Sequence, residues 1–277
     1  MKKENKKKYF GKSAALALTL IGISAVSFNA LAEGAMAAEL TRPQSVPTTY
    51  NVTPPQETEV PENYEKADYT IIMEDFSETP TSKDLTAEEA AELGAQMLWE
   101  IYGADLDGAY VFMSYNSGTE TFNRAFWSGD VRFTKKRTPS DFCYTFMLDA
   151  VTGDRFNVGH SRQLDVKVPL GPDSSLSKDH SEYDALAVKA AEDFNIVHGA
   201  VASTEYNCQG YGSNNNPDIT IDVVGTNGER SSLTFSRYNQ ELMGVIYDSS
   251  RRISDKSLAA LEGTGFGEFQ EMQAIPQ

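Results

Sequence analysis

The stretch 144-YTFMLDAVTGD-154 contains one strand and the turn that ends it. Its aromatic and aliphatic residues, Tyr144 to Leu148, are typical of a largely buried strand. Asp149 then suits a turn because its carboxylate can accept backbone hydrogen bonds, and Gly153 can adopt a positive φ. The segment therefore predicts a strand over 142–149, a turn at 152–154, and a return strand over 155–158.

Upstream of this stretch, the sequence predicts a helix over 87–102. Thr86 and Glu89 have the spacing of a capping box, and Gly103 is a typical helix end. Gly94 lowers the helix propensity by about 1 kcal/mol relative to alanine without breaking the pattern. The apolar residues recur at helical spacing and form one buried stripe: Ala90, Leu93, Met97, Leu98 and Ile101. Strand-like segments at 110–115, 121–127 and 130–135 lie between this helix and the opening stretch.

A similar order of elements follows a Gly/Pro/Ser linker at 170–175. A helix is expected over 182–195 with Ser181 as its cap, followed by strands over 199–208, 219–224, 232–238 and 242–247. Asn227-Gly228 predicts a two-residue hairpin turn of type I′ between the second and third of these strands. We therefore expect an α+β protein with two tandem repeats, 84–168 and 176–250, each one helix packed on a small antiparallel β-sheet. Residues 251–277 are expected to form a short helix at 255–261 and a tail.

The start of the chain has the three parts of a secretory signal peptide: a lysine-rich segment, an apolar run over 14–28, and Ala30-Leu31-Ala32 as a cleavage site. The apolar run is shorter than the roughly 18–20 residues that span a bilayer, although an uncleaved anchor is the alternative. We expect residues 1–32 to be removed and 33–83, rich in Pro, Thr and Glu, to be a disordered linker. Residues 69–73 are an exception that could add an edge strand.

The net charge of the chain limits the classes of partner that it can bind. Removal of residues 1–32 takes away six Lys and Glu4, which leaves 18 basic and 39 acidic residues and changes the net charge from −16 to −21. Such a field repels nucleic acid and anionic lipid, so we expect neither nucleic-acid binding nor stable membrane insertion after signal removal. We expect a secreted, extracellular protein, in the wall space of a Gram-positive bacterium. In that oxidising location Cys143 and Cys208 could form a disulfide, or remain two buried thiols.

The opening stretch also resembles the most typical segment of PepSY-type domains, an aromatic-rich strand followed by Asp-Ala and a Thr-Gly turn. The helix about 50 residues upstream fits the same pattern, whereas the second half of the chain resembles the family only in layout, since Tyr238-Asn239-Gln240-Glu241 replaces the signature. The resemblance implies a binding or regulatory module, because such domains occur in peptidase propeptides and exported bacterial proteins and are thought to inhibit or chaperone peptidases. The resemblance implies no catalytic role for any residue of this chain.

The sequence nominates no catalytic, cofactor-binding or metal-ligating set. His160, His180 and His198 have no metal-binding spacing and are expected at the surface or near helix caps. The stretch 105-DLDG-108 is too short for a calcium loop and is expected to form a turn. No nucleophile elbow, P-loop or dinucleotide fingerprint is present. We therefore expect no enzyme and no cofactor.

Three functions remain in order of preference. The first is a secreted, non-enzymatic module that binds an extracellular protein and modulates a peptidase. The second is a cell-wall or glycan-binding module, and the third is a hydrolase whose site is assembled only in space. A candidate binding surface consists of loop aromatics and one cation, which could equally be core residues at strand ends: Arg124, Phe126, Trp127, Tyr206 and Tyr211.

Overall fold

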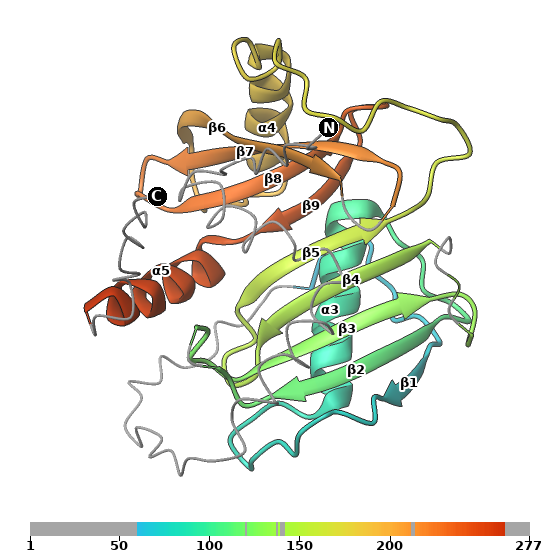
Figure 1. Ribbon diagram of the computed structural model, residues 1–277. Coiled ribbons are helices and arrows are strands. Elements are labelled where there is room, and N and C mark those ends of the chain that lie inside the picture. Colours follow the sequence, from blue (N-terminus) through green and yellow to red (C-terminus); the bar gives the residue numbers. More distant parts are fainter. Residues whose placement is uncertain (1–59, 120, 137, 139–141, 212–213, 264–277) are drawn as a thin grey trace, which may run out of the picture.

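The computed structural model describes residues 60–119, 121–136, 138, 142–211 and 214–263, the last seven by backbone alone (Figure 1). Nine strands in this part of the chain form one sheet in the order β1-β2-β3-β4-β5-β9-β8-β7-β6, and only β1 and β2 run parallel. The strands are β1 (Thr70–Met73), β2 (Tyr110–Asn116), β3 (Phe126–Arg132), β4 (Cys143–Asp149), β5 (Arg155–Ser161), β6 (Val201–Tyr211), β7 (Pro217–Gly225), β8 (Arg230–Ser236) and β9 (Leu242–Ile246).

The prediction of two tandem repeats, each with its own small sheet, is therefore wrong. Val158 of β5 pairs with Val245 of β9, and Gly159 pairs with Gly244, so the sheet continues across the boundary between 84–168 and 176–250. A Cβ on Gly159 would lie 3.0 Å from the carbonyl oxygen of Met243, so glycine permits this close approach. The pairing joins two strand edges that would otherwise leave their backbone groups unpaired.

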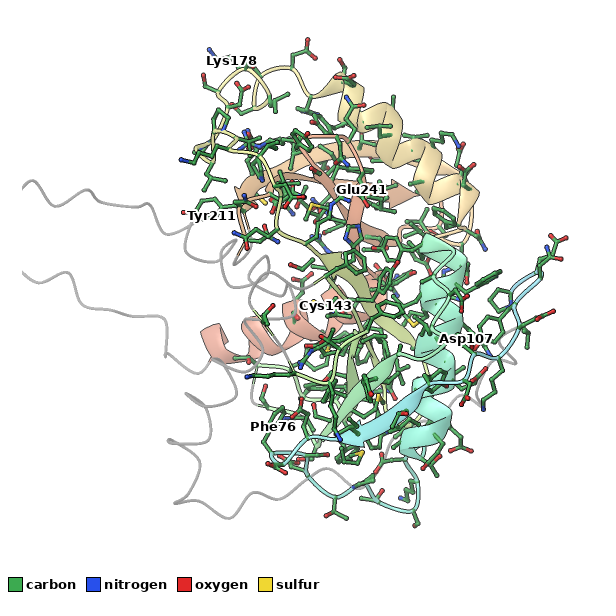
Figure 2. All side chains as sticks on the ribbon, turned by 90° about the vertical axis from the view of Figure 1, so that its right-hand side faces the viewer. Phe76, Asp107, Cys143, Lys178, Tyr211 and Glu241 are labelled. Carbon is green, nitrogen blue, oxygen red and sulfur yellow. The ribbon has the colours of Figure 1, made fainter. Side chains whose placement is uncertain are left out.

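Helices cover both faces of this sheet. The helix α3 (Ala87–Tyr102) contacts β1 to β5, and α4 (Ser181–Asp193) contacts β6 and β7. The third helix, α5 (Asp248–Gly263), contacts β5 and β8 from the opposite side, as Figure 2 shows. The helix α5 starts well before the predicted 255–261. We call the side of the sheet that carries α5 the α5 face.

The helix α3 is capped as its sequence predicts. Glu89 N–H donates to Thr86 Oγ1 over 3.2 Å, and Thr86 N–H donates to Glu89 Oε2 over 2.8 Å. Gly103 ends the helix with a φ of 60°. Gly94 has a packing role, because a Cβ there would lie 2.3 Å from the ring of Phe146 on β4. Gly129 of β3 meets the same ring equally closely, so the two glycines make room for one phenylalanine.

Local turn chemistry is confirmed in part. Asp149 Oδ1 accepts the N–H groups of Val151 and Thr152, and Gly153 has a φ of 75°, as the opening stretch predicts. The hairpin after β7 is also present. Its predicted type I′ turn is wrong, since that turn needs positive φ at both central residues and here only Gly228 has it.

Other boundaries differ from the sequence prediction. The segments 121–127 and 130–135 contribute to a single strand, β3, and His180 rather than Ser181 is the N-cap residue of α4. Within the predicted linker 33–83, residues 69–73 do supply the edge strand β1, and Tyr64 and Tyr69 donate hydrogen bonds to Glu92 on α3. The predicted signal peptide and final tail lie outside the described residues. Within those residues, no helix is both long and apolar enough to cross a bilayer.

Candidate functional site

A row of small side chains crosses the α5 face. Thr145, Gly159, Gly244, Thr234 and Thr220 are register partners on five adjacent strands, β4, β5, β9, β8 and β7. They lie on this face because the residues that alternate with them, such as Phe146 and Ile221, belong to the core beneath α3 and α4. Polar residues gather at the β6–β8 end of the row, where Thr220 and Thr234 share a hydrogen bond of 2.9 Å.

Asp222 on β7 is the centre of one cluster of polar side chains at this end of the row. Its Oδ1 accepts hydrogen bonds from Asn207 Nδ2 over 3.0 Å, Ser232 Oγ over 2.6 Å and Arg251 Nη1 over 2.8 Å. Its Oδ2 accepts from Arg230 over 2.8 Å and 3.1 Å. Burial raises the pKa of Asp222, but these partners outweigh it and the pKa is lowered. Since Arg251 belongs to α5, this buried carboxylate fastens the helix to the sheet.

Asp218 lies on the same face of β7 and is bound very differently. The residue is 7% exposed, yet its Oδ1 has no hydrogen-bond partner among the described residues. Burial raises the pKa of Asp218 to about 6, although a backbone hydrogen bond from Gly210 and the charge of Arg237 partly oppose this rise. The carboxylate therefore has one donor on the backbone, while its buried Oδ1 has no donor among the described residues.

Asn216, just before β7, supplies a complementary group. It is fully buried; its Oδ1 accepts a hydrogen bond of 2.7 Å from Ser236 Oγ, and its Nδ2 has no partner among the described residues. Ser236 is also the register partner of Asp218 on β8. Ser236 is therefore linked to both residues, to Asp218 as its register partner and to Asn216 by a hydrogen bond. Most buried polar groups in proteins are paired, so two unpaired atoms here need an explanation.

The thiol nearest to this pair in the register is not activated. Cys208 on β6 is the register partner of Thr220, and burial raises the pKa of its thiol to about 12, so the thiol stays protonated at neutral pH. Among the described residues, no group of three or more His, Cys, Asp or Glu side chains is arranged to hold a metal ion. The pair offers a hydrogen-bond acceptor at Asp218 and a donor at Asn216, and because both residues are buried, a ligand reaches these atoms only if neighbouring residues move.

The structure does not bring the predicted binding surface together. Trp127 is 1% exposed in the main core and donates from Nε1 to the Leu85 carbonyl oxygen over 2.9 Å, and Phe126 lies in a smaller buried cluster with Met147 and Phe156. Arg124 binds Asp149, the turn residue after β4. Trp127 and Phe126 are therefore core residues at a strand end, which was the alternative to a binding surface, whereas Arg124 is partly exposed and bound to the turn residue Asp149.

Tyr206 and Tyr211 belong to β6, at the far end of the sheet. Tyr206 packs against His180 with ring centroids 5.6 Å apart, and Tyr211 is 56% exposed. Four strands, β7, β8, β9 and β5, separate Tyr211 on β6 from β4, whose last residue Asp149 binds Arg124. Of the two alternatives for Cys143 and Cys208, the structure contains two thiols and no disulfide. Four strands separate Cys143 from Cys208, which corresponds to roughly 24 Å, whereas a disulfide needs Cα atoms within about 7 Å.

The buried position of His160 contradicts the expectation that all three histidines lie at the surface or near helix caps. Its side chain is buried between the rings of Tyr102 and Phe142, with Nε2 3.2 Å from the Leu242 carbonyl oxygen and 3.3 Å from Glu241. The sequence does not predict the burial of His160, because that burial depends on the pairing of β5 with β9. The 105–108 stretch does form a turn, in which Asp107 accepts a hydrogen bond from Asp68 N–H.

No family model and no curated protein matches the chain. A solved structure that matches is the Bacillus megaterium YpeB C-terminal domain, with a TM-score of 0.35 and 9% sequence identity over 71% of this chain and 70% of that chain. A likeness this distant carries no inference about fold or function. The PepSY resemblance of residues 144–154 therefore stays a prediction, and no match supports two copies of such a domain.

Proposed function

We propose that the chain is a non-catalytic binding module that holds an extended polypeptide segment at the polar end of the α5 face. The observation that carries this proposal is the pair of buried, unpaired atoms beside Ser236, Asp218 Oδ1 and Asn216 Nδ2. A peptide group presents one N–H donor and one C=O acceptor, which complement this acceptor and this donor.

Energetics favours a ligand over a purely structural role. A buried polar atom without a partner costs about 1–3 kcal/mol, and Asp218 bears the further cost of ionising in a buried place. Asp222 shows that the same strand can satisfy a buried carboxylate completely. Groups kept unsatisfied are typical of functional sites, where stability is lower than the fold could provide.

This role agrees with the function expected from the sequence. An exported module that captures an extended segment could modulate an extracellular peptidase by holding its propeptide or another strand. Export, location in the wall space and a peptidase as partner remain parts of the proposal. The wall-binding alternative depended on Trp127 and Tyr211 sharing a surface, and Trp127 is buried.

Selection from a phage-displayed library of random 12-residue peptides on the immobilised full-length chain tests the proposal. We expect enriched peptides that bind in calorimetry and lose at least tenfold in affinity to Asp218→Val and to Asn216→Leu, which remove one free atom each. Thr145→Val, on the same face but in β4, is the matched control and should bind normally. No enrichment, or equal binding to all four proteins, would refute the site.

A second measurement concerns the partner. The full chain, immobilised and exposed to medium in which extracellular peptidases are active, should retain a peptidase and change its rate. Asp218→Val should do neither. Peptide binding without any effect on a peptidase would support the peptide-binding role and refute only the proposed regulation of a peptidase.

A further inference from the structure

The strand β1 is at one end of the sheet that the described residues form. The N–H of Thr70 donates to the Ala109 carbonyl oxygen and the N–H of Glu74 donates to that of Met113, each over 2.9 Å. In a parallel pair, alternate residues direct both backbone groups to the same side. Ile71 and Met73 therefore direct their N–H and C=O groups away from β2. Among the described residues, no strand lies on that side.

The other terminal strand shows how this protein protects an edge. The strand β6 has two register shifts against β7, and irregularities of this kind discourage pairing with another chain. Gln209 on β6 also exchanges two hydrogen bonds of 2.9 Å with the backbone of Asp173, so a loop lies against this strand. By contrast, β1 has an unbroken register with β2 and contains neither lysine nor proline. It is short, but within the described part of the chain it has no bulge against β2 and no strand beyond it.

Side chains along this edge favour an extended, cationic partner. Met73 is 44% exposed and Phe76 is 46% exposed, and Figure 2 shows Phe76 at the outside of the molecule. Residues 60–107 contain thirteen Asp and Glu but two Lys, whereas residues 108–263 contain twenty acidic and fifteen basic residues. One of those two lysines, Lys66, already pairs with Glu92. The acidic residues next to the strand in sequence are Asp68, Glu74, Asp75 and Glu78; of these, Glu74 also interacts with the charge of Arg132 on β3, and Glu78 accepts a hydrogen bond from Ser117 N–H.

We infer that the β1 edge is a docking surface for a basic, extended segment of a partner protein, which adds to the sheet as a tenth strand. Backbone hydrogen bonds to Ile71 and Met73 hold the segment, and its lysine or arginine side chains meet the acidic flanks. A second copy of this chain fits less well, because two β1 edges would bring two strongly acidic segments together. The inference does not depend on Asp218, which lies at the other end of the sheet.

A pair of seven-residue peptides tests this surface: acetylated and amidated KVKVKVK, and its acidic counterpart EVEVEVE, each with a fluorophore. Binding to the full-length chain is followed by fluorescence anisotropy at 20 mM and 500 mM NaCl. We expect the basic peptide to bind at least tenfold more tightly than the acidic one, with a clear loss of affinity at high salt. It should also slow hydrogen exchange of the Ile71 and Met73 amides, and the chain should remain monomeric in light scattering.

Met73→Pro is the decisive variant, because it removes an outward N–H and leaves the N–H groups that pair with β2 intact. It should abolish binding, whereas Met73→Ala, which keeps the N–H, should lose only a few-fold. Circular dichroism and thermal melting show whether Met73→Pro remains folded. Should it unfold, protection of the Met73 amide in the parent chain decides instead. Unaltered amide exchange, or equal binding of the acidic peptide, would overturn the inference.

Discussion

Asp218 and Asp222 lie four residues apart on the same face of β7, and only Asp222 has its carboxylate fully bound. Asp222 accepts hydrogen bonds from four side chains, which together lower its pKa despite burial. The free Oδ1 of Asp218 has no partner among the described residues, and burial raises the pKa of Asp218 to about 6. The first aspartate to mutate for function is therefore Asp218, and Asp222 serves as the structural control.

Asp218→Asn should stabilise the fold above pH 6. The pKa of Asp218 rises from 3.8 to about 6 on folding, so its contribution to stability is present below pH 3.8 and is lost as the pH rises through 6. Two pKa units correspond to about 3 kcal/mol, and the buried amide offsets part of this gain, so we expect about 1–3 kcal/mol at pH 8. Urea unfolding at pH 4 and pH 8 measures the difference, which should vanish at pH 4. A variant that is less stable at both values would contradict this assignment.

Asp222→Asn should have the opposite effect. The substitution leaves Arg251 without its buried anionic partner and weakens the bond to Ser232. Loss of one partner from a buried ion pair costs about 3–5 kcal/mol. We expect a loss of this order in urea unfolding at pH 7, together with faster hydrogen exchange in the first turns of α5. Stability within 1 kcal/mol of the parent chain would show that α5 is not fastened through Asp222.

Gly94→Ala should destabilise the protein although alanine is the better helix former. The new Cβ would lie 2.3 Å from the Phe146 ring, and overpacking of this kind costs about 1–3 kcal/mol. Gly171→Ala is the control, because no atom lies within 4 Å of a Cβ at that position. Thermal melting should show a clear loss for Gly94→Ala and almost none for Gly171→Ala. Combination with Phe146→Leu should recover part of the loss; no recovery would place the strain elsewhere.

His160 should make the fold sensitive to mild acid. Burial lowers the pKa of His160 below 6.5, although Glu241 and the Leu242 carbonyl partly raise it, and Arg162 lowers it further. The unfolded chain therefore takes up this proton first, and stability falls as the pH drops below 6.5. Urea unfolding between pH 7.5 and pH 5 should show a smaller decline for His160→Gln than for the parent chain. His198→Gln, whose side chain is largely exposed, should leave the decline unchanged.

Both cysteines should react as thiols and not as a disulfide. A thiol assay in denaturant should detect two thiols per chain without reductant, because Cys143 and Cys208 lie on strands separated by four others. In the folded protein Cys208 should alkylate slowly at pH 8, since burial raises the pKa of its thiol to about 12. An assay that finds no thiols would contradict the strand order itself.

Much of the local structure was predictable from neighbouring residues. The capping box at Thr86 and the Asp149 turn were expected and are present, because their hydrogen bonds join residues two or three positions apart. Phe126 and Trp127 show the limit of such reasoning. Their aromatic side chains suit a surface site and a core equally well, and only the helices on both faces of the sheet decide for the core.

The sequence by itself determined where most strands, helices and turns lie, because backbone preference and apolar periodicity are local properties. The tertiary structure alone decided that β5 pairs with β9, since the pairing is made by backbone hydrogen bonds that any two free strand edges can form. The same holds for Asp218, which is an ordinary acidic residue in the sequence. It becomes a buried, unpaired carboxylate only when β6, β7 and β8 assemble around it.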